Sequence, residues 1–147
     1  MIRGYLGGPP GRLRPFVVAA LAIPDLDVSG AIHFLVDTGA DATVLSPRDA
    51  TVLALNPARL PPGPASVGVG GKTPTVSCAA IVTLDSLAFT VRLRVLAPMS
   101  NMQRRTLARI PSLLGRDVLS HFALFFEDRT NRVLLLEPHE ADRVPLP

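Results

Sequence analysis

Two long runs of alternating residues, joined by only two polar residues, most constrain what this chain can fold into. Residues 75–84 and 87–96 flank Asp85 and Ser86, and in the second run one set of alternate residues is apolar while the other carries Thr and Arg. A period of two is typical of a strand with one buried face. The two runs therefore predict a long hairpin, and with it a sheet-based fold.

Shorter elements are expected around this hairpin. Apolar runs bounded by turn residues predict strands at residues 16–23, 31–36, 110–114, 122–127 and 132–136. Ser46 and Pro47 suit the capping and first positions of a helix that runs to Leu55, and residues 116–121 favour a second short helix. Many short strands with one or two brief helices predict an all-β, barrel-like fold.

The chain has the length of a single domain. It has 147 residues and no internal repeat, and we expect the domain to span residues 16–136. Residues 1–15 are rich in Gly and Pro and predict a flexible segment. Residues 137–147 are polar and predict a loosely ordered tail, and residues 98–109 predict a polar loop.

Positive charge is spread thinly along the sequence. The net charge is +3, Lys72 is the only lysine, and the densest basic group is Arg104, Arg105 and Arg109. Aromatic residues make up 5% and Trp is absent, so stacking platforms for nucleic-acid bases are not expected. A solvated, Arg-rich surface is favoured over a clustered nucleic-acid-binding face, and we predict no nucleic-acid partner.

Other features argue against a membrane protein, an exported protein and a metalloprotein. Residues 16–23 are too few for a bilayer span of roughly 20 residues, and although arginines precede them as in a signal peptide, their strand-like character favours no export. Cys78 is the only cysteine, so no internal disulfide forms, which favours a core position and the reducing cytoplasm. His33, His121 and His139 are scattered, so no metal site is expected.

One segment carries a chemical signal. Asp37 ends an apolar strand and is followed by Thr38 and Gly39. The strand delivers one carboxylate to the edge of the core, Gly39 allows a tight turn and leaves room above the carboxylate, and Thr38 adds a nearby hydroxyl. Asp and Gly are also ordinary turn residues, so this triplet alone does not separate a site from a strand-to-turn junction.

The flanking sequence favours a site. Residues 34–46, FLVDTGADATVLS, resemble the active-site motif of the retroviral-type aspartic proteases, the retropepsins. Residues 68–71, GVGG, resemble the flap tip of that family, and residues 113–117, LLGRD, resemble the segment that closes its barrel and begins a helix. The resemblance covers residues 16–136. It implies an all-β, single-domain retropepsin-like acid protease barrel with its active site at a homodimer interface.

The resemblance also implies roles for individual residues. Asp37 is expected as the catalytic carboxylate, Thr38 as a hydrogen-bond partner of its twin in a second subunit, and Gly39 as a backbone contact to substrate. Asp41 and Arg116 are expected to form an ion pair between the catalytic loop and the following helix. The other expected substrate contacts are the flap residues Gly68, Val69, Gly70 and Gly71 and the pocket walls Ala40, Val44, Val69, Pro111 and Leu113.

A single Asp-Thr-Gly triplet makes one chain half of a two-carboxylate site. A two-fold dimer would bring two Asp37 side chains together, and like charges about 3 Å apart share one proton. The ionised carboxylate would take a proton from water while the protonated one polarises the peptide carbonyl. The expected function is a homodimeric aspartic endopeptidase without metal or organic cofactor, whose partners are itself and a peptide or protein substrate.

Alternatives stay open at the level of sequence. The fold could serve as a non-catalytic dimerisation or peptide-binding module, or as a basic nucleic-acid-binding barrel. Residues 104–109 fit two roles, a basic wall of the cleft that favours acidic substrate positions and a solvated surface. Residues 122–136 are apolar on both faces near Phe125, which suggests a covered sheet and a dimer interface.

Overall fold

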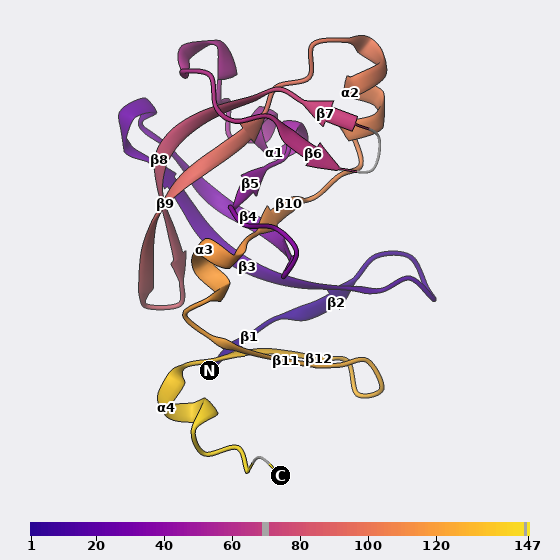
Figure 1. The fold of residues 1–147 in the computed structure, drawn as a ribbon, viewed down its shortest axis with the longest axis vertical. Coiled ribbons are helices and arrows are strands. Elements are labelled where there is room, and N and C mark those ends of the chain that lie inside the picture. The colour runs from indigo at the N-terminus through magenta and orange to yellow at the C-terminus, as the bar shows by residue number, and fades with distance from the viewer. Residues whose placement is uncertain (69–70, 146) are drawn as a thin grey trace.

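One long sheet closes on itself to form a barrel. The computed structural model describes residues 1–68, 71–145 and 147. Seven strands follow the order β2-β3-β4-β10-β5-β9-β8, and a further pairing of β3 with β8 closes six of them into a barrel (Figure 1). Their bounds are β2 Tyr5–Gly7, β3 Arg14–Ile23, β4 Val28–Val36, β5 Val44–Leu45, β8 Thr75–Leu84, β9 Leu87–Leu96 and β10 Ser112–Leu114. The expected all-β barrel is confirmed.

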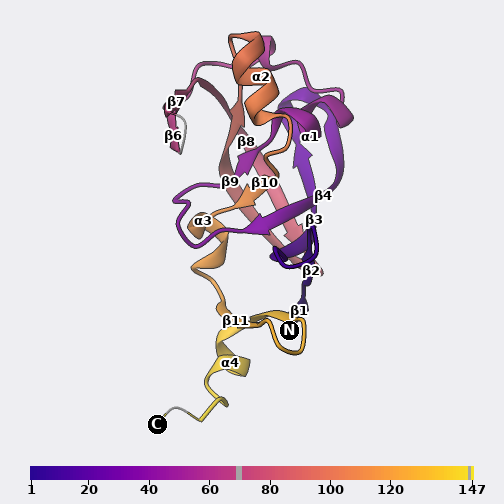
Figure 2. The same ribbon diagram turned by 90° about the vertical axis from the view of Figure 1, so that its right-hand side faces the viewer.

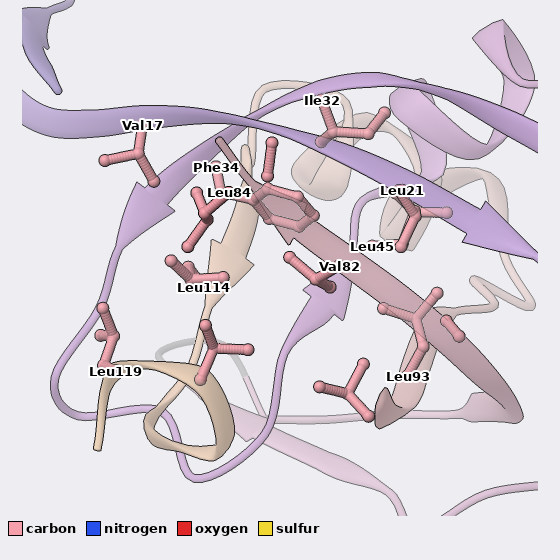
Figure 3. Packing of buried hydrophobic residues seen from close by; sticks show 14 of the residues in the cluster. Val17, Leu21, Ile32, Phe34, Leu45, Val82, Leu84, Leu93, Leu114 and Leu119 are labelled. Atoms are coloured by element: carbon pink, nitrogen blue, oxygen red, sulfur yellow. The ribbon is translucent and has the colours of Figure 1, made fainter. Parts of the chain in front are cut away.

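The two alternating runs form the longest hairpin of the barrel. Strands β8 and β9 pair antiparallel, from Thr75 opposite Leu96 to Leu84 opposite Leu87, so the predicted hairpin is confirmed. Inward-facing residues from β3, β4, β5, β8, β9 and β10 fill the barrel, as Figure 3 shows, and include Val17, Leu21, Ile32, Phe34, Leu45, Val82, Leu84, Leu93 and Leu114. Cys78 is buried among these core residues, as expected.

A short parallel pairing positions the segment that follows β4. Leu35 and Val36 lie opposite Leu113 and Leu114 of β10, and Leu113 also lies opposite Val44 of β5. The end of β4 therefore lies between β3 and β10, with Leu35 opposite both Phe16 and Leu113. The residues after Val36 must emerge at this edge of the barrel, beside β5 and β10.

The N-terminal segment is not the flexible lead-in that its composition predicts. Strand β1, Ile2–Arg3, pairs with β12, Arg132–Leu136, and β12 pairs with β11, Ala123–Glu127, to give a second sheet below the barrel in Figures 1 and 2. Ile2 is only 4% exposed. The expectation of a flexible segment is corrected because the partner of β1 comes from the other end of the chain, which local composition does not reveal.

The C-terminal tail also has more structure than expected. Helix α4, Pro138–Ala141, begins with a capping box in which Glu137 and Glu140 exchange hydrogen bonds. The N-terminal ammonium group of Met1 lies 2.7 Å from a carboxylate oxygen of Glu140. The expectation of a loose tail is corrected for these residues, because polar composition does not show that the two ends of the chain meet.

The described residues contain four short α-helices, where one or two were expected. Helices α1, Pro47–Val52, and α3, Arg116–Leu119, fall where helices were predicted. Helix α2, Asn101–Leu107, lies in the expected polar loop, and its signal is local: the Ser100 hydroxyl accepts the Gln103 amide hydrogen at 3.1 Å. Short 3-10 turns occur at Pro24–Leu26 and Pro57–Arg59. None of the described helices has the length and apolar character needed to cross a membrane.

A small two-stranded arm projects from the barrel beside α2. Its strands are β6, Ser66–Gly68, and β7, Gly71–Thr73, with Gly68 opposite Gly71. Figure 2 shows the arm extending outward on the same side as the loop after β4. Val69 and Gly70, two of the four expected flap residues, lie outside the described residues.

Candidate active site

Asp37 is held in a tight turn directly after β4. Its amide hydrogen donates to the carbonyl of Leu114 at 3.1 Å, and its own carbonyl accepts the amide hydrogen of Ala40 at 3.2 Å. Its carboxylate oxygen Oδ1 accepts the amide hydrogen of Gly39 at 2.9 Å. The side chain is half-buried. The turn thus fixes one carboxylate at the edge of the barrel and leaves part of it accessible.

The residues after Asp37 differ in their exposure. Thr38 is exposed, and its hydroxyl forms no hydrogen bond to any described residue. At Gly39 a Cβ atom would lie 3.3 Å from Oδ1 of Asp37, which is a tight approach to the carboxylate. Glycine here keeps space free directly above the acid. The structure thus leaves one hydroxyl and one carboxylate of the triplet open to a partner.

The turn is tied to α3 by backbone hydrogen bonds and by an ion pair. The amide hydrogen of Arg116 donates to the carbonyl of Ala40 at 2.8 Å, and that of Asp117 donates to the carbonyl of Asp41 at 3.2 Å. The guanidinium of Arg116 donates to the carboxylate of Asp41. Both side chains are largely exposed, Arg116 at 59% and Asp41 at 74%. An ion pair this exposed contributes little to the stability of the fold.

A second, less exposed tie was not recognised from the sequence. The carboxylate of Asp117 accepts the backbone amide hydrogen of Thr43 at 2.9 Å and its hydroxyl hydrogen at 2.7 Å. The Thr43 hydroxyl in turn accepts the amide hydrogen of Gly115 at 3.2 Å. Thr43 is completely buried. The sequence signal for this contact is Asp117, the last residue of LLGRD, directly after Arg116.

Asp37 opens into a cleft of 840 Å³ between the barrel, the β6–β7 arm and α2. Six of the predicted site residues line it, namely Asp37, Gly39, Ala40, Val44, Gly71 and Leu113. Asp41, predicted for the ion pair, also lines the cleft, whereas Thr38, Pro111 and Arg116 do not. The turn, the arm and the β5–β10 edge therefore meet around one cavity.

Helix α2 supplies a wall of the cleft that the sequence reading missed. Its residues Met102, Gln103, Thr106 and Leu107 face the cavity. The basic residues of this segment do not line it, and Arg104 instead lines a separate cavity of 650 Å³ between α1 and α2. Arg104 and Arg105 lie on α2 between the residues that face the cleft, and Arg109 follows the helix. None of the three lines the cleft, so the idea that they form its basic wall is corrected.

The cleft carries both signs of charge. Its acidic lining residues are Asp37 and Asp41, and its basic lining residues are Arg14, Lys72 and Arg94. Because Asp41 is paired with Arg116, Asp37 is the acid left to face the cavity among the described residues. No group of three or more His, Cys, Asp or Glu side chains in the described part of the chain is arranged to hold a metal ion. The chemistry the site offers is that of a carboxylate in a partly basic groove.

Comparisons with known proteins place this cleft in context. Residues 27–121 match the family model described as "gag-polyprotein putative aspartyl protease". A retropepsin-like aspartic protease from Rickettsia conorii superposes with a TM-score of 0.58 at 18% identity, covering 90% of this chain and 87% of its own. The EIAV protease, solved with the inhibitor HBY-793, gives a TM-score of 0.53 at 24% identity, covering 78% of this chain and 92% of its own. No curated protein sequence matches the chain significantly. The two structural matches share the fold, and the family match spans the Asp37 turn and α3.

Proposed function

This chain belongs to the gag-polyprotein aspartyl protease family, and from that premise we propose that it is a homodimeric aspartic endopeptidase with Asp37 as its catalytic residue. The observation that carries the proposal is the half-buried Asp37 carboxylate at the edge of an 840 Å³ cleft. A cavity of this size, walled by a hairpin arm and apolar side chains, suits an extended peptide. The family and the fold support peptide hydrolysis over other uses of one carboxylate.

The second carboxylate comes from a second copy of the chain. Within the described residues, the one other acid in the cleft is Asp41, and its charge is engaged by Arg116. The sequence contains one Asp-Thr-Gly triplet. A two-fold axis close to Asp37 would place two identical carboxylates face to face, and the exposed Thr38 hydroxyls would then be free to hydrogen-bond across the axis.

The mechanism follows from the chemistry of two close carboxylates. At about 3 Å both cannot ionise, so the pair shares one proton and titrates as a unit. The ionised carboxylate takes a proton from a bound water, which attacks the scissile carbonyl as the protonated carboxylate polarises it. The tetrahedral diol then collapses as the pair protonates the leaving amine. Gly39 would offer its carbonyl to the substrate backbone, and residues 68–71 would cover the peptide from above.

The surface we assign to the dimer is the free edge of β11. In the sheet order β1-β12-β11, β11 is one of the two outer strands. Its side chains Leu124, Phe125 and Phe126 are exposed large apolar groups. An apolar edge strand invites pairing with another strand, and β11 follows directly on α3, which is hydrogen-bonded to the Asp37 turn. Pairing of β11 with its copy would therefore act close to the catalytic turn.

The lone, buried Cys78 suits a protein that works in the reducing cytoplasm.

The test is cleavage of a diverse peptide library at mildly acid pH, read by mass spectrometry. We expect cleavage that a statine-type inhibitor blocks and that Asp37→Asn abolishes. Asp27→Asn is the matched control, because it neutralises an acid in a distant turn whose left-handed backbone suits asparagine equally well. A purified dimer that cleaves nothing, with an Asp37→Asn variant that binds peptides as the unaltered protein does, would identify a binding module instead.

A further inference from the structure

Arg94 is a half-buried cation in the cleft with no acidic partner. It lies in β9, where Leu93 and Val95 on either side of it point into the core and are fully buried. Its own side chain points to the opposite face and lines the same cavity as Asp37. Among the described residues, its guanidinium makes neither an ion pair nor a hydrogen bond, although Arg116, Arg129 and Arg132 all have acidic partners.

The backbone around Arg94 is fixed on both sides. Its amide hydrogen donates to the carbonyl of Thr43 at 3.1 Å. It lies opposite Val44 of β5 and opposite Ser77 of β8, and both of these residues are buried. The backbone of Arg94 is therefore held in place by both neighbouring strands, while its side chain lines the cavity. A rigid strand is a better base for a specificity contact than a loop.

The charges nearby leave Arg94 free to meet a ligand. Of the two acids in the cleft, Asp41 is engaged by Arg116 and Asp37 is the proposed catalytic group. Lys72 from β7 and Arg14 from β3 line the same cavity and add positive charge. A half-buried arginine without a counter-charge has given up part of its hydration without a partner in return, and a carboxylate matches its planar fork of donors with two parallel hydrogen bonds.

We propose that Arg94 is a specificity-determining residue that binds an aspartate or glutamate side chain of the substrate close to the scissile bond. The inference rests on the proposed peptidase function and names its substrate class, peptides that are acidic next to the cleavage site. Val44, Leu96 and Leu107 pack together and line the same cavity as Arg94, so the carboxylate would bind beside an apolar part of the cleft. A charge-assisted contact of this kind favours Glu over Gln by about 10- to 100-fold.

The experiment measures binding rather than turnover. The probes are peptides in which statine replaces the scissile residue, carrying Glu or Gln at each position on either side, acetylated and amidated so that the side chain is the only carboxylate. Affinities are measured by calorimetry for the unaltered protein, for Arg94→Met, and for Arg92→Met. Met keeps an unbranched apolar stem without the charge. Arg92 is the matched control, because it lies on the same face of β9 two residues away but outside the cleft.

We expect tighter binding of the Glu peptide at one or two positions, lost in Arg94→Met and kept in Arg92→Met, with Gln-peptide affinity changed less than about threefold. Equal affinity for Glu and Gln, a Glu preference that survives in Arg94→Met, or no binding of either peptide would overturn the inference. A neutral peptide with a free C-terminus that binds through Arg94 better than any Glu peptide would also overturn it, by showing that a terminal carboxylate is the ligand. Cleavage of the library, assayed separately, decides the peptidase proposal on its own.

Discussion

Gly115 shows how one residue without a side chain lets the segment after Asp37 pack closely against α3. A Cβ atom at this position would lie 2.4 Å from the carbonyl carbon of Ala42 and 2.9 Å from the amide nitrogen of Thr43. Both are backbone atoms and cannot move aside. The close approach lets the Gly115 amide hydrogen reach the buried Thr43 hydroxyl. Any other residue here would push the segment after Asp37 away from α3.

Substitutions of two neighbouring residues on α3, Arg116 and Asp117, should differ sharply in their effect on stability. Asp117→Ala leaves the buried amide and hydroxyl of Thr43 without an acceptor, and we expect it to lower the free energy of unfolding by about 1–3 kcal/mol. Arg116→Met removes only the exposed ion pair with Asp41, and we expect a change below about 1 kcal/mol. Urea unfolding of the two variants measures both. An Arg116→Met loss equal to that of Asp117→Ala would show that the ion pair, not the buried tie, holds the turn.

Residues whose role depends on their immediate neighbours could be predicted from the sequence. Asp37 and Gly39 form a strand-to-turn unit within a few residues, and the structure brings both to the cleft. Arg94 could not be identified in this way. Its strand pattern shows only that it faces away from the core, and Arg92 shares that pattern while lying outside the cleft. The parallel contact between β5 and β9, which the sequence does not show, makes the difference.

At the scale of elements, α2 shows how a local signal can be outweighed by composition. The segment begins after Pro98 and is rich in polar residues, which is typical of a loop. Ser100 and Gln103 nevertheless form a capping pair, with the Gln103 side chain accepting the amide hydrogen of Met99 at 2.8 Å. Leu107 is buried against Val44 and Leu96. The Ser100–Gln103 cap at its start and the burial of Leu107 at its end support this helix, which forms a wall of the cleft.

The β11–β12 hairpin contains Glu127, whose lowered pKa predicts how the stability of the folded protein depends on pH. Hydrogen bonds from Thr130, Arg132 and Arg129 lower the pKa of Glu127 from 4.5 to about 2. A carboxyl with a lowered pKa stabilises the folded state fully above its ordinary value, and that stability is lost as the pH falls through the lowered value. We therefore expect the stability advantage of the unaltered protein over Glu127→Gln to be constant at neutral pH and to shrink between pH 4.5 and about 2.

Urea unfolding of both proteins at several pH values measures this advantage. Asp128→Asn is the control, since it neutralises the next acid along the turn without removing these hydrogen bonds. An advantage of Glu127 over Gln that stays unchanged down to pH 2 would contradict the low pKa. The Glu127 side chain is still 21% exposed, so raising the salt concentration should reduce the effect.

At the scale of the whole molecule, the barrel follows from strand patterns but the terminal sheet does not. The β8–β9 and β3–β4 hairpins are local pairings with clear turns between them, and they were predictable. Pairing of Ile2 with Leu135 joins the two ends of the chain, and no local pattern marks it. The same sheet leaves β11 as an outer strand with exposed aromatic side chains, a property of the assembled molecule that local strand patterns leave undetermined.

That outer strand predicts how the dimer can be broken. In the proposed pairing of β11 with its copy, side chains on one face of the strand approach their counterparts across the two-fold axis, and like charges placed there repel. We expect the double variant Leu124→Lys and Phe126→Lys to sediment as a monomer and to lose peptide cleavage, because each subunit holds only one Asp37. The barrel should stay folded by circular dichroism, since Leu124 and Phe126 are 38% and 47% exposed and are not part of its core.

Val52→Lys is the matched control for this variant. Val52 is 76% exposed on α1, away from β11, so its charge should change neither sedimentation nor cleavage. Dilution of the unaltered protein gives an independent measurement, because below the dissociation constant the activity of an obligate dimer falls with the square of the protein concentration. If the β11 variant stays dimeric, the interface lies on another surface. If it becomes monomeric and still cleaves, one chain is sufficient, and the pairing of two Asp37 carboxylates is not the source of the activity.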